Sequence, residues 1–532
     1  MTDSTASFFA STAYNLSLQL GLKVVTFLLN AWLIRVLTPT ILGIANVRLM
    51  LLYTTTSFLV REPFRRSCIR EEGQTPASPL HWAQLINTLW LCPLICIPVA
   101  ALLALIWTAW LEQPDQPWYV ESVWVYAASL WIECLAEPFW ILGQQLHFVK
   151  TKAVIEATQL FLRNILLISS IIYALMWIRC FVKELQEIPA KAKSEDEQSS
   201  EIKYNGLTPK GLLPSRGAGL DQESLLVARD FFSHCLLKHF LTEGERLLMT
   251  FTGILSFADQ GIYDIIHNLG SLVARVVFAP LEESAHTFFS LNLRERLRKA
   301  SRLLRHLLRL TMLMGLVVCV FGVTYARLAL HLYAGPSFSQ GPALRLLQAY
   351  CPYILLLALN GITESFLFTI ISTPQMNQHK ALLVATCLLF VAIVCLGQSL
   401  GTLVFVLANS VNMLARVSFS LYQIWRFYSA MEVREEARFR ALREAGEGEA
   451  EDLRPLRALL PPLRLLATLA GAGFMTGLTG LIFGLDGLFN IAAHAAFGAI
   501  SLLFTLFTIY ASEQQLVAFI ETHIVRNKAK AD

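Results

Sequence analysis

One stretch decides the fold of this chain: KHFLTEGERLLMTFTGILSFADQGIYDIIHNLGSLVARVVFAPLEESAHTFF, which runs from Lys238 to Phe289. It predicts two long apolar helices joined at Ala258-Asp259-Gln260-Gly261. Among its charged and titratable side chains are Glu243, Glu245, Arg246, Asp264, His267, Arg275, Glu282 and Glu283. A charge at the centre of a bilayer costs about 2.5–3.5 kcal/mol, so such groups must face a protein interior or a wet cavity. The stretch therefore predicts a membrane protein whose working part is a polar chamber.

The composition of the whole chain agrees with that reading. Residues of the AVILMFWYC set make up 55% of the 532 residues and charged residues 15%, whereas soluble domains carry about 25% charged residues. Apolar runs of about 20 residues, enough to cross a bilayer, recur throughout. We expect an all-α polytopic membrane protein with thirteen spans: 14–37, 41–62, 82–111, 120–147, 152–180, 229–257, 262–290, 303–333, 343–371, 380–398, 401–428, 463–485 and 488–512.

The ten cysteines are scattered, mostly in apolar helices, and form no CxxC pair. They are typical of small buried hydrophobic residues, so we expect no metal site and no cofactor. Two hydrophilic segments interrupt the apolar pattern. They predict an N-terminal helix bundle, a polar linker, a second bundle, a charged cytosolic loop and a C-terminal helix pair with a tail, at residues 1–182, 183–228, 229–430, 431–460 and 461–532 respectively.

The two predicted bundles resemble each other in sequence. Three anchors recur in the same order: Gly43 with Gly261 (261 − 43 = 218), Pro63 with Pro280 (280 − 63 = 217) and Glu137 with Glu364 (364 − 137 = 227). Each bundle would then contain a helix, a glycine turn, a second helix and a Pro-apolar-charge-charge-Ser motif. Such a parallel repeat predicts pseudo-symmetric bundles with a binding chamber between them.

The distribution of basic residues predicts the orientation. Lysine and arginine gather after the spans 41–62 and 120–147, within 294–309 and at the C-terminus, whereas the connections 112–119, 258–261 and 484–487 hold acids and no bases. By the positive-inside rule the basic ends, including the C-terminus, are cytosolic. Equal orientation of the bundles requires an even number of crossings between them, yet only five spans precede the linker. One helix is missing from the expected pattern near residues 175–200.

Several motifs identify a family resemblance. They are NVRLMLLYTTTSFLVREPFRR, AEPFW, LTEGERLLMTF, ADQGIYDIIHNLGSLVAR, PLEES and FVLANSVNMLAR, and they resemble the Rft family of endoplasmic-reticulum proteins. This resemblance covers nearly the whole chain. It implies the multidrug/oligosaccharidyl-lipid/polysaccharide flippase fold with usually fourteen spans. It also implies that the chain moves dolichol-diphosphate oligosaccharide from the cytosolic to the luminal leaflet for N-glycosylation. The chain departs from the family where the sixth helix would lie.

The implied substrate points to arginine, because a guanidinium stays charged and presents a fork of donors to phosphate oxygens. The candidates for this role are Arg35, Arg61, Arg275 and Arg416, and Asn409 and Asn412 are candidates for bonding sugar hydroxyls. The plainer interpretation is that each arginine pairs with a nearby acid, such as Arg61 with Glu62, or extends to an interface. The asparagines would then serve as contacts between helices. Arg163 is expected to pair with Glu156.

Two further sets of charges carry hypotheses. In the first hypothesis, that of a cytosolic gate, Arg65 and Arg66 form salt bridges with Glu282 and Glu283, which occupy the equivalent positions of the other repeat. These salt bridges would hold the cytosolic end of the chamber shut when the chamber faces the lumen. Solvated helix ends are the alternative, worth only about 0–1 kcal/mol per pair. The second set comprises acids that could bind a proton or cation or accept hydrogen bonds between helices: Glu133, Glu137, Glu243 and Glu364.

Three other functions stay open at this point. An endoplasmic-reticulum glycosyltransferase would need an acidic pair in a luminal loop, and Glu243-Gly244-Glu245 is the nearest match. An ion-coupled antiporter on the same fold is the second, and an accessory protein that binds the lipid-linked oligosaccharide or the N-glycosylation enzymes is the third. The chain has no GxxxxGK[ST] motif for ATP-driven pumping. We expect no enzyme activity and no nucleic-acid partner, and we expect membrane lipid around the spans.

Overall fold

The structure, a computed structural model, describes residues 27–68, 79–146, 154–155, 158, 171–183, 212–215, 217–292, 297–444, 459–485 and 487–520. The regular elements within these residues are helices, and ten are long and apolar enough to cross a membrane. They are 39–68, 80–110, 119–145, 257–290, 300–333, 342–370, 374–396, 403–430, 463–483 and 488–512. The chain is therefore an all-α, multi-pass membrane protein, as predicted. The predicted spans 14–37 and 152–180 lie partly outside the described residues, so the count of thirteen stays a prediction.

The chain divides by its internal contacts into two units, Met1–Gly261 and Ile262–Asp532. The helices of the first unit are Phe27–Val36, α2 (Pro39–Gly43), η1 (Ile44–Leu49), α3 (Met50–Cys68), α4 (Pro79–Leu89), α5 (Leu91–Leu105), η2 (Ile106–Trp110), α6 (Tyr119–Cys134), α7 (Glu137–Gln145), residues 171–183 and α11 (Gln222–Thr252). Helix α3 packs against α5, α6 and α11. The core of this unit contains the fully buried rings of Trp82, Trp107 and Trp177.

The first long helix begins where its sequence predicts. Thr38 is extended and caps the helix by accepting a hydrogen bond from the Ile41 amide at 3.4 Å, and Pro39 occupies the first turn, where no amide donor is needed. The helix then continues without a break through η1 and α3 to Cys68. One charged face of a single rod therefore carries Arg61 and Arg65, one turn apart.

The predicted glycine turns are wrong. Gly43 lies inside the first long helix and Gly261 inside α12 (Phe257–Gly270). The joint between α11 and α12 lies one turn earlier, at residues 253–256, where Gly253 has a left-handed φ of 61°. The two repeat-related glycines instead permit close packing. A Cβ on Gly43 would overlap the Phe257 carbonyl oxygen, and a Cβ on Gly261 would overlap that of Pro39.

Helix α11 forms as predicted, but its packing was not foreseen. It lies against α3 in the first unit, although residues 229–257 were predicted to begin the second bundle. It is also absent from the ten helices that are apolar enough to cross a membrane, because it carries charges such as Lys238, Glu243 and Glu245. The predicted domain limits and the span at 229–257 stay predictions, since a helix can pack on one bundle and belong by repeat to the other.

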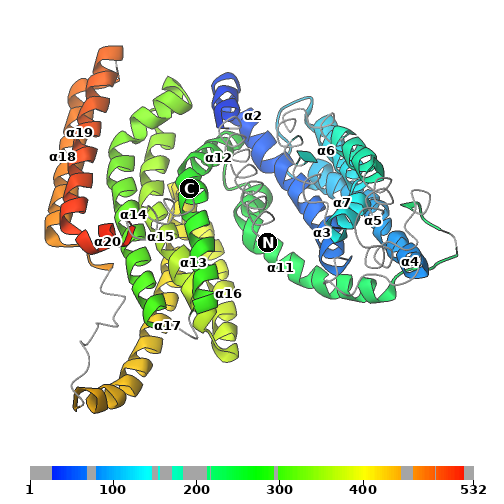
Figure 1. Cartoon of the computed structure of the whole chain (residues 1–532). Coiled ribbons are helices and arrows are strands. Elements are labelled where there is room, and N and C mark those ends of the chain that lie inside the picture. The colour runs from blue at the N-terminus through cyan, green and yellow to red at the C-terminus, as the bar shows by residue number, and fades with distance from the viewer. Residues whose placement is uncertain are drawn as a thin grey trace. The chain divides into compact units, whose positions relative to one another are not determined.

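The second unit contains, after α12, the elements η4 (Ala274–Phe278), α13 (Ala279–Asn292), α14 (Leu297–Tyr333), η5 (Pro336–Phe338), α15 (Pro342–Ile370), α16 (Thr373–Leu396), η6 (Gln398–Leu400), α17 (Leu403–Glu444), α18 (Leu463–Phe483), α19 (Leu488–Ser512) and α20 (Gln514–Ile520). Helix α15 packs against α13, α14 and α17. Helices α18 and α19 form the predicted C-terminal pair and lie side by side against α14 (Figure 1). Tyr325 of α14 joins them, because its ring stacks on His494 with centroids 4.4 Å apart.

Candidate functional site

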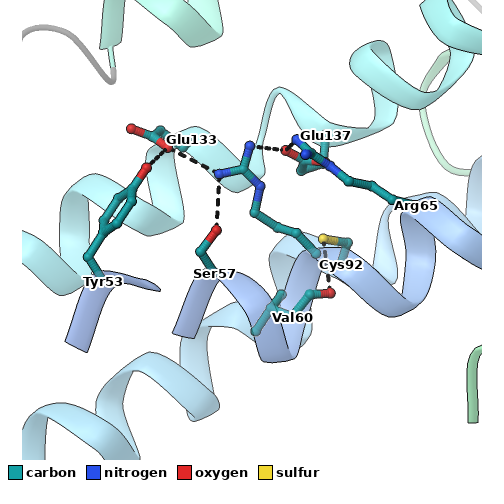
Figure 2. Close-up of polar contacts among 8 residues, drawn as sticks. Tyr53, Ser57, Val60, Arg65, Cys92, Glu133 and Glu137 are labelled. Atoms are coloured by element: carbon teal, nitrogen blue, oxygen red, sulfur yellow. Dashed lines mark hydrogen bonds and ion pairs between the residues drawn. The ribbon is translucent and has the colours of Figure 1, made fainter. Parts of the chain in front are cut away.

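A buried group of four charged side chains joins α3 to α6 and α7. The Arg61 guanidinium reaches Glu133 at 3.2 Å and also pairs with Glu137. Arg65 binds Glu137 with two hydrogen bonds of 2.7 and 2.8 Å. Glu137 is wholly buried and Arg61 is 9% exposed. Figure 2 shows Glu133 and Glu137 facing the α3 side chains across this interface.

Helical spacing places these four charges together. Arg61 and Arg65 lie one turn apart on α3, and Glu133 and Glu137 lie one turn apart along α6 and α7, so each pair shares a helix face. The Tyr53 hydroxyl donates to Glu133, and Arg61 donates to the Ser57 hydroxyl at 3.3 Å. Both neighbours are labelled in Figure 2, on the same helix as Arg65.

The ring of Trp140 covers the outer part of this cluster. The Arg65 guanidinium carbon lies 3.9 Å from the Trp140 ring centroid, in a cation–π contact. Two arginines and two glutamates balance to zero charge. A buried cluster of this kind is costly to form but holds its helices in one arrangement, because loss of any member strands a charge.

A second buried cluster lies in the second unit around Glu364 of α15. Its carboxylate pairs with Arg416 of α17, lies 3.2 Å from the His379 Nε2 of α16, and accepts a hydrogen bond of 2.9 Å from the Asn360 amide. His379 is 2% exposed. Glu282 of α13 lies beside this group, because a Cβ on Gly361 would meet the Glu282 carboxyl carbon at 3.1 Å. Glu364 therefore links α15, α16 and α17.

The arginines predicted to bind phosphate fall into two classes. Arg61 and Arg416 are already paired with carboxylates, and the predicted partner Glu62 belongs instead to Arg66, at 2.8 Å. Sequence spacing favoured Glu62 for Arg61, but adjacent residues on a helix point in different directions. Arg35 and Arg275 are exposed. Their predicted role in binding stays a prediction.

Arg275 differs from the buried arginines in its exposure and its contacts. It lies in the π-helical turn η4 and donates to the Asn268 carbonyl at 2.7 Å. Within the part of the chain that the structure describes, it has no carboxylate partner. Its predicted role in binding phosphate stays a prediction.

The predicted gate residues have local partners. Arg65 pairs with Glu137 and Arg66 with Glu62, all in the first unit. Glu282 is half-buried and Glu283 exposed. The predicted gate would therefore require these arginines to exchange partners, and it stays a prediction.

The contacts of the other predicted polar residues are as follows. Asn409 is buried and donates to the Tyr263 hydroxyl at 3.5 Å, whereas the Asn412 Oδ1 is buried without a hydrogen-bond partner in the described residues. Glu243 pairs with Arg246 at 3.1 Å along α11. The predicted pair Arg163 and Glu156 and the C-terminal tail lie outside the described residues.

Sequence reasoning missed Arg48. This side chain is 1% exposed and donates to the main-chain oxygens of Glu112 and Thr250, the latter at 3.2 Å. Its guanidinium also lies 5.0 Å from the Phe257 ring centroid. It therefore ties η1 to the loop after η2, to the end of α11 and to the start of α12. The motif NVRLMLL contains this arginine inside an apolar run, and that rarity was the available signal.

Comparisons with known proteins agree with one another over most of the chain. The sequence is 35% identical over 498 residues to the Man(5)GlcNAc(2)-PP-dolichol translocation protein RFT1 of Xenopus tropicalis, covering 87% of each chain. It is 36% identical over 446 residues to the protein of that name from Mus musculus, covering 78% of this chain and 81% of the mouse protein.

A solved structure gives the fold independently. The lipid II flippase MurJ in its inward closed conformation matches with a TM-score of 0.53 over 92% of this chain and 99% of its own, at 12% identity. The description "Rft protein" belongs to the family whose sequence profile matches residues 7–181 and 166–522. This chain belongs to the Rft protein family.

Proposed function

We propose that this chain moves dolichol-diphosphate-linked oligosaccharide from the cytosolic to the luminal leaflet of the endoplasmic reticulum, for N-glycosylation. The observation that carries the proposal is the 35% identity, over 87% of each chain, to a relative named a Man(5)GlcNAc(2)-PP-dolichol translocation protein. The MurJ-like fold supports it, because that fold also belongs to a lipid flippase. The task breaks no covalent bond, so the chain acts as a transporter and not as an enzyme.

The physical problem is to carry a diphosphate and many hydroxyls past hydrocarbon. Arg275 is the residue best placed to meet the diphosphate, since it is exposed and has no carboxylate partner in the described residues. Arg61 and Arg416 would reach a phosphate only by releasing Glu137 and Glu364. Asn409 and Asn412 would meet the sugar, and the dolichol tail stays in lipid.

The proposed membrane, orientation and partners are those predicted from the sequence. The chain would lie in the endoplasmic-reticulum membrane with its C-terminus cytosolic, in contact with membrane lipid and with N-glycosylation enzymes. One family helix is missing near residue 175. The family profile matches the chain in two segments, 7–181 and 166–522, whose ends overlap in this region.

Reconstitution tests the proposal directly. The purified protein is placed in vesicles with a fluorescent dolichol-diphosphate oligosaccharide, and the fraction of probe exposed to the outside is followed with time. We expect exchange faster than in empty vesicles and no exchange of a dolichol-free oligosaccharide. Binding of the probe without exchange would overturn the proposal and identify an accessory factor. Exchange driven only by an ion gradient with organic cations would identify an antiporter.

A further inference from the structure

The two repeats place opposite charges at one equivalent position. The offset that aligns Pro63 with Pro280 also aligns Arg65 with Glu282 (282 − 65 = 217). The partner position holds glutamate in both repeats, Glu137 in the first and Glu364 in the second, at an offset of 227. In the first unit the side chains at these two positions have opposite charges and attract each other, and Arg65 binds Glu137 at 2.7 Å. In the second unit both positions carry carboxyl groups.

The packing of α13 on α15 keeps these carboxyl groups close. Glu282 lies against Gly361, and Ser365 donates to the Glu282 main-chain oxygen at 3.4 Å. Gly361 and Glu364 are three residues apart, so they lie on one face of α15. The glycine provides the space for the Glu282 side chain, because a Cβ there would overlap it. The α13–α15 interface therefore brings two acids together inside an apolar unit.

The charges around this pair do not balance. In the described residues, the charged and titratable groups that face Glu282 and Glu364 are Arg416 from α17, His379 from α16 and His286 from α13 itself. His286 is exposed. Two carboxylates therefore stand against one permanent cation, and the cluster is short of one positive charge unless His379 is protonated. The cluster in the first unit has no such deficit.

We propose that Glu282, Glu364 and His379 form a proton-binding site in the second unit, which holds one proton while α13 is packed against α15. A proton fits this group better than a metal ion, because hard cations prefer a shell of oxygens, whereas Glu364 lies 3.2 Å from the Nε2 of a buried imidazole, that of His379. The buried Asn360 Oδ1, which has no partner in the described residues, offers a further acceptor beside the site.

The proton would switch the second unit between two arrangements, one with α13 packed against α15 and one with the two helices separated. With the proton bound, the cluster is balanced and α13 stays against α15. Without the proton, Glu282 and Glu364 repel each other and favour separation of the two helices. A proton binds the packed state better than the separated one, and so shifts the population between them. This inference goes beyond the proposed function, because it does not depend on which lipid is carried.

Infrared difference spectroscopy tests the proposal on the full-length protein in lipid nanodiscs without lipid-linked oligosaccharide. Spectra are compared between about pH 8 and about pH 5, the range in which a histidine site changes charge. The wild type should show uptake of one proton on a buried carboxyl or imidazole group. Glu282→Arg, which copies Arg65 of the first unit, should lose that signal, as should Glu282→Gln. Glu283→Gln, at the exposed neighbouring position, should keep it.

Three results would overturn the proposal. They are absence of the buried signal in the wild type, its persistence in both Glu282 variants, and its removal by sodium at fixed pH, which would make the ligand a metal cation. Melting curves confirm that each variant is folded, and Glu282→Gln preserves the side-chain volume if Glu282→Arg does not fold. The spectra are recorded without lipid-linked oligosaccharide. A negative result would therefore overturn the proton site without bearing on the proposed lipid transport, which the leaflet-exchange assay tests.

Discussion

Gly43 and Gly261 occupy equivalent positions in the two sequence repeats, and their backbones meet. A Cβ on either glycine would lie 2.9 Å from the amide nitrogen of the other. This reciprocal contact is what a local two-fold relation between the segments Pro39–Gly43 and Phe257–Gly261 produces. It gives the predicted repeat a physical basis at this point, because only glycine permits so close an approach.

Gly43→Ala and Gly261→Ala are therefore expected to destabilise the protein. Each added methyl group must push the facing backbone away, and overpacking of this kind costs about 1–3 kcal/mol. Thermal melting in detergent measures the loss. Gly471→Ala in α18 is the matched control, because a Cβ there meets nothing within 4 Å, and it should leave the melting temperature equal or higher. Equal effects at all three positions would contradict the contact.

Glu137→Gln is expected to cause a large loss of stability. The variant leaves buried Arg61 and half-buried Arg65 beside one remaining carboxylate, and removing one partner of a buried ion pair costs about 3–5 kcal/mol. Glu62→Gln is the control, because its partner Arg66 is 43% exposed, and such pairs contribute about 0–1 kcal/mol. Melting temperatures compare the two. A small effect for Glu137→Gln would show that water reaches the cluster.

Arg48→Met should destabilise the first unit through its hydrogen bonds. The carbonyl oxygens of Glu112 and Thr250 would lose this donor, and a buried oxygen such as that of Thr250 costs about 1–3 kcal/mol when left unsatisfied. Arg48→Lys should recover only part of this loss, because a lysine lacks the fork that serves two acceptors. Melting temperature is the readout. Full recovery by lysine would mean that charge, and not geometry, matters at this position.

Arg275→Ala separates binding from stability. If this exposed guanidinium meets the diphosphate, its loss removes a charge-assisted hydrogen bond worth about 1.5–3 kcal/mol, or roughly a tenfold to hundredfold loss of affinity. Binding of a fluorescent dolichol-diphosphate probe in nanodiscs measures this change, and the melting temperature should stay the same. Arg61→Ala should show the opposite pattern, with lower stability. Unchanged binding by Arg275→Ala would remove this residue from the proposed site.

The fold could be predicted from the sequence to a large extent. Apolar length sets where a helix crosses a bilayer, and the predicted spans 463–485 and 488–512 agree within two residues with the observed helices Leu463–Phe483 and Leu488–Ser512. The joint between α11 and α12 was misplaced because ADQG has the composition of a turn. In the structure Ser256 instead caps α12: its hydroxyl accepts a hydrogen bond of 3.2 Å from the Asp259 amide and donates one of 2.7 Å to the Asp259 carboxylate.

Most members of the two buried clusters were named from the sequence, although their role in a functional site stays a prediction. Arg61, Arg65, Glu137, Glu364 and Arg416 were all singled out by their charge within apolar runs. Their partners were not foreseen, because Arg61 and Glu137 are 76 residues apart in the chain (137 − 61 = 76) and meet only when α3 packs on α6 and α7.

Apolar length, charge and motif are local properties of the chain, so the sequence was enough to predict a helical membrane protein of the Rft family. Which charges neutralise one another became clear only once the helices were packed. Ion pairing depends on distances of a few ångströms between helices, and packing sets those distances. That is why Arg61 proved to be paired with two glutamates and Glu282 proved to lie beside a second acid with one positive charge too few.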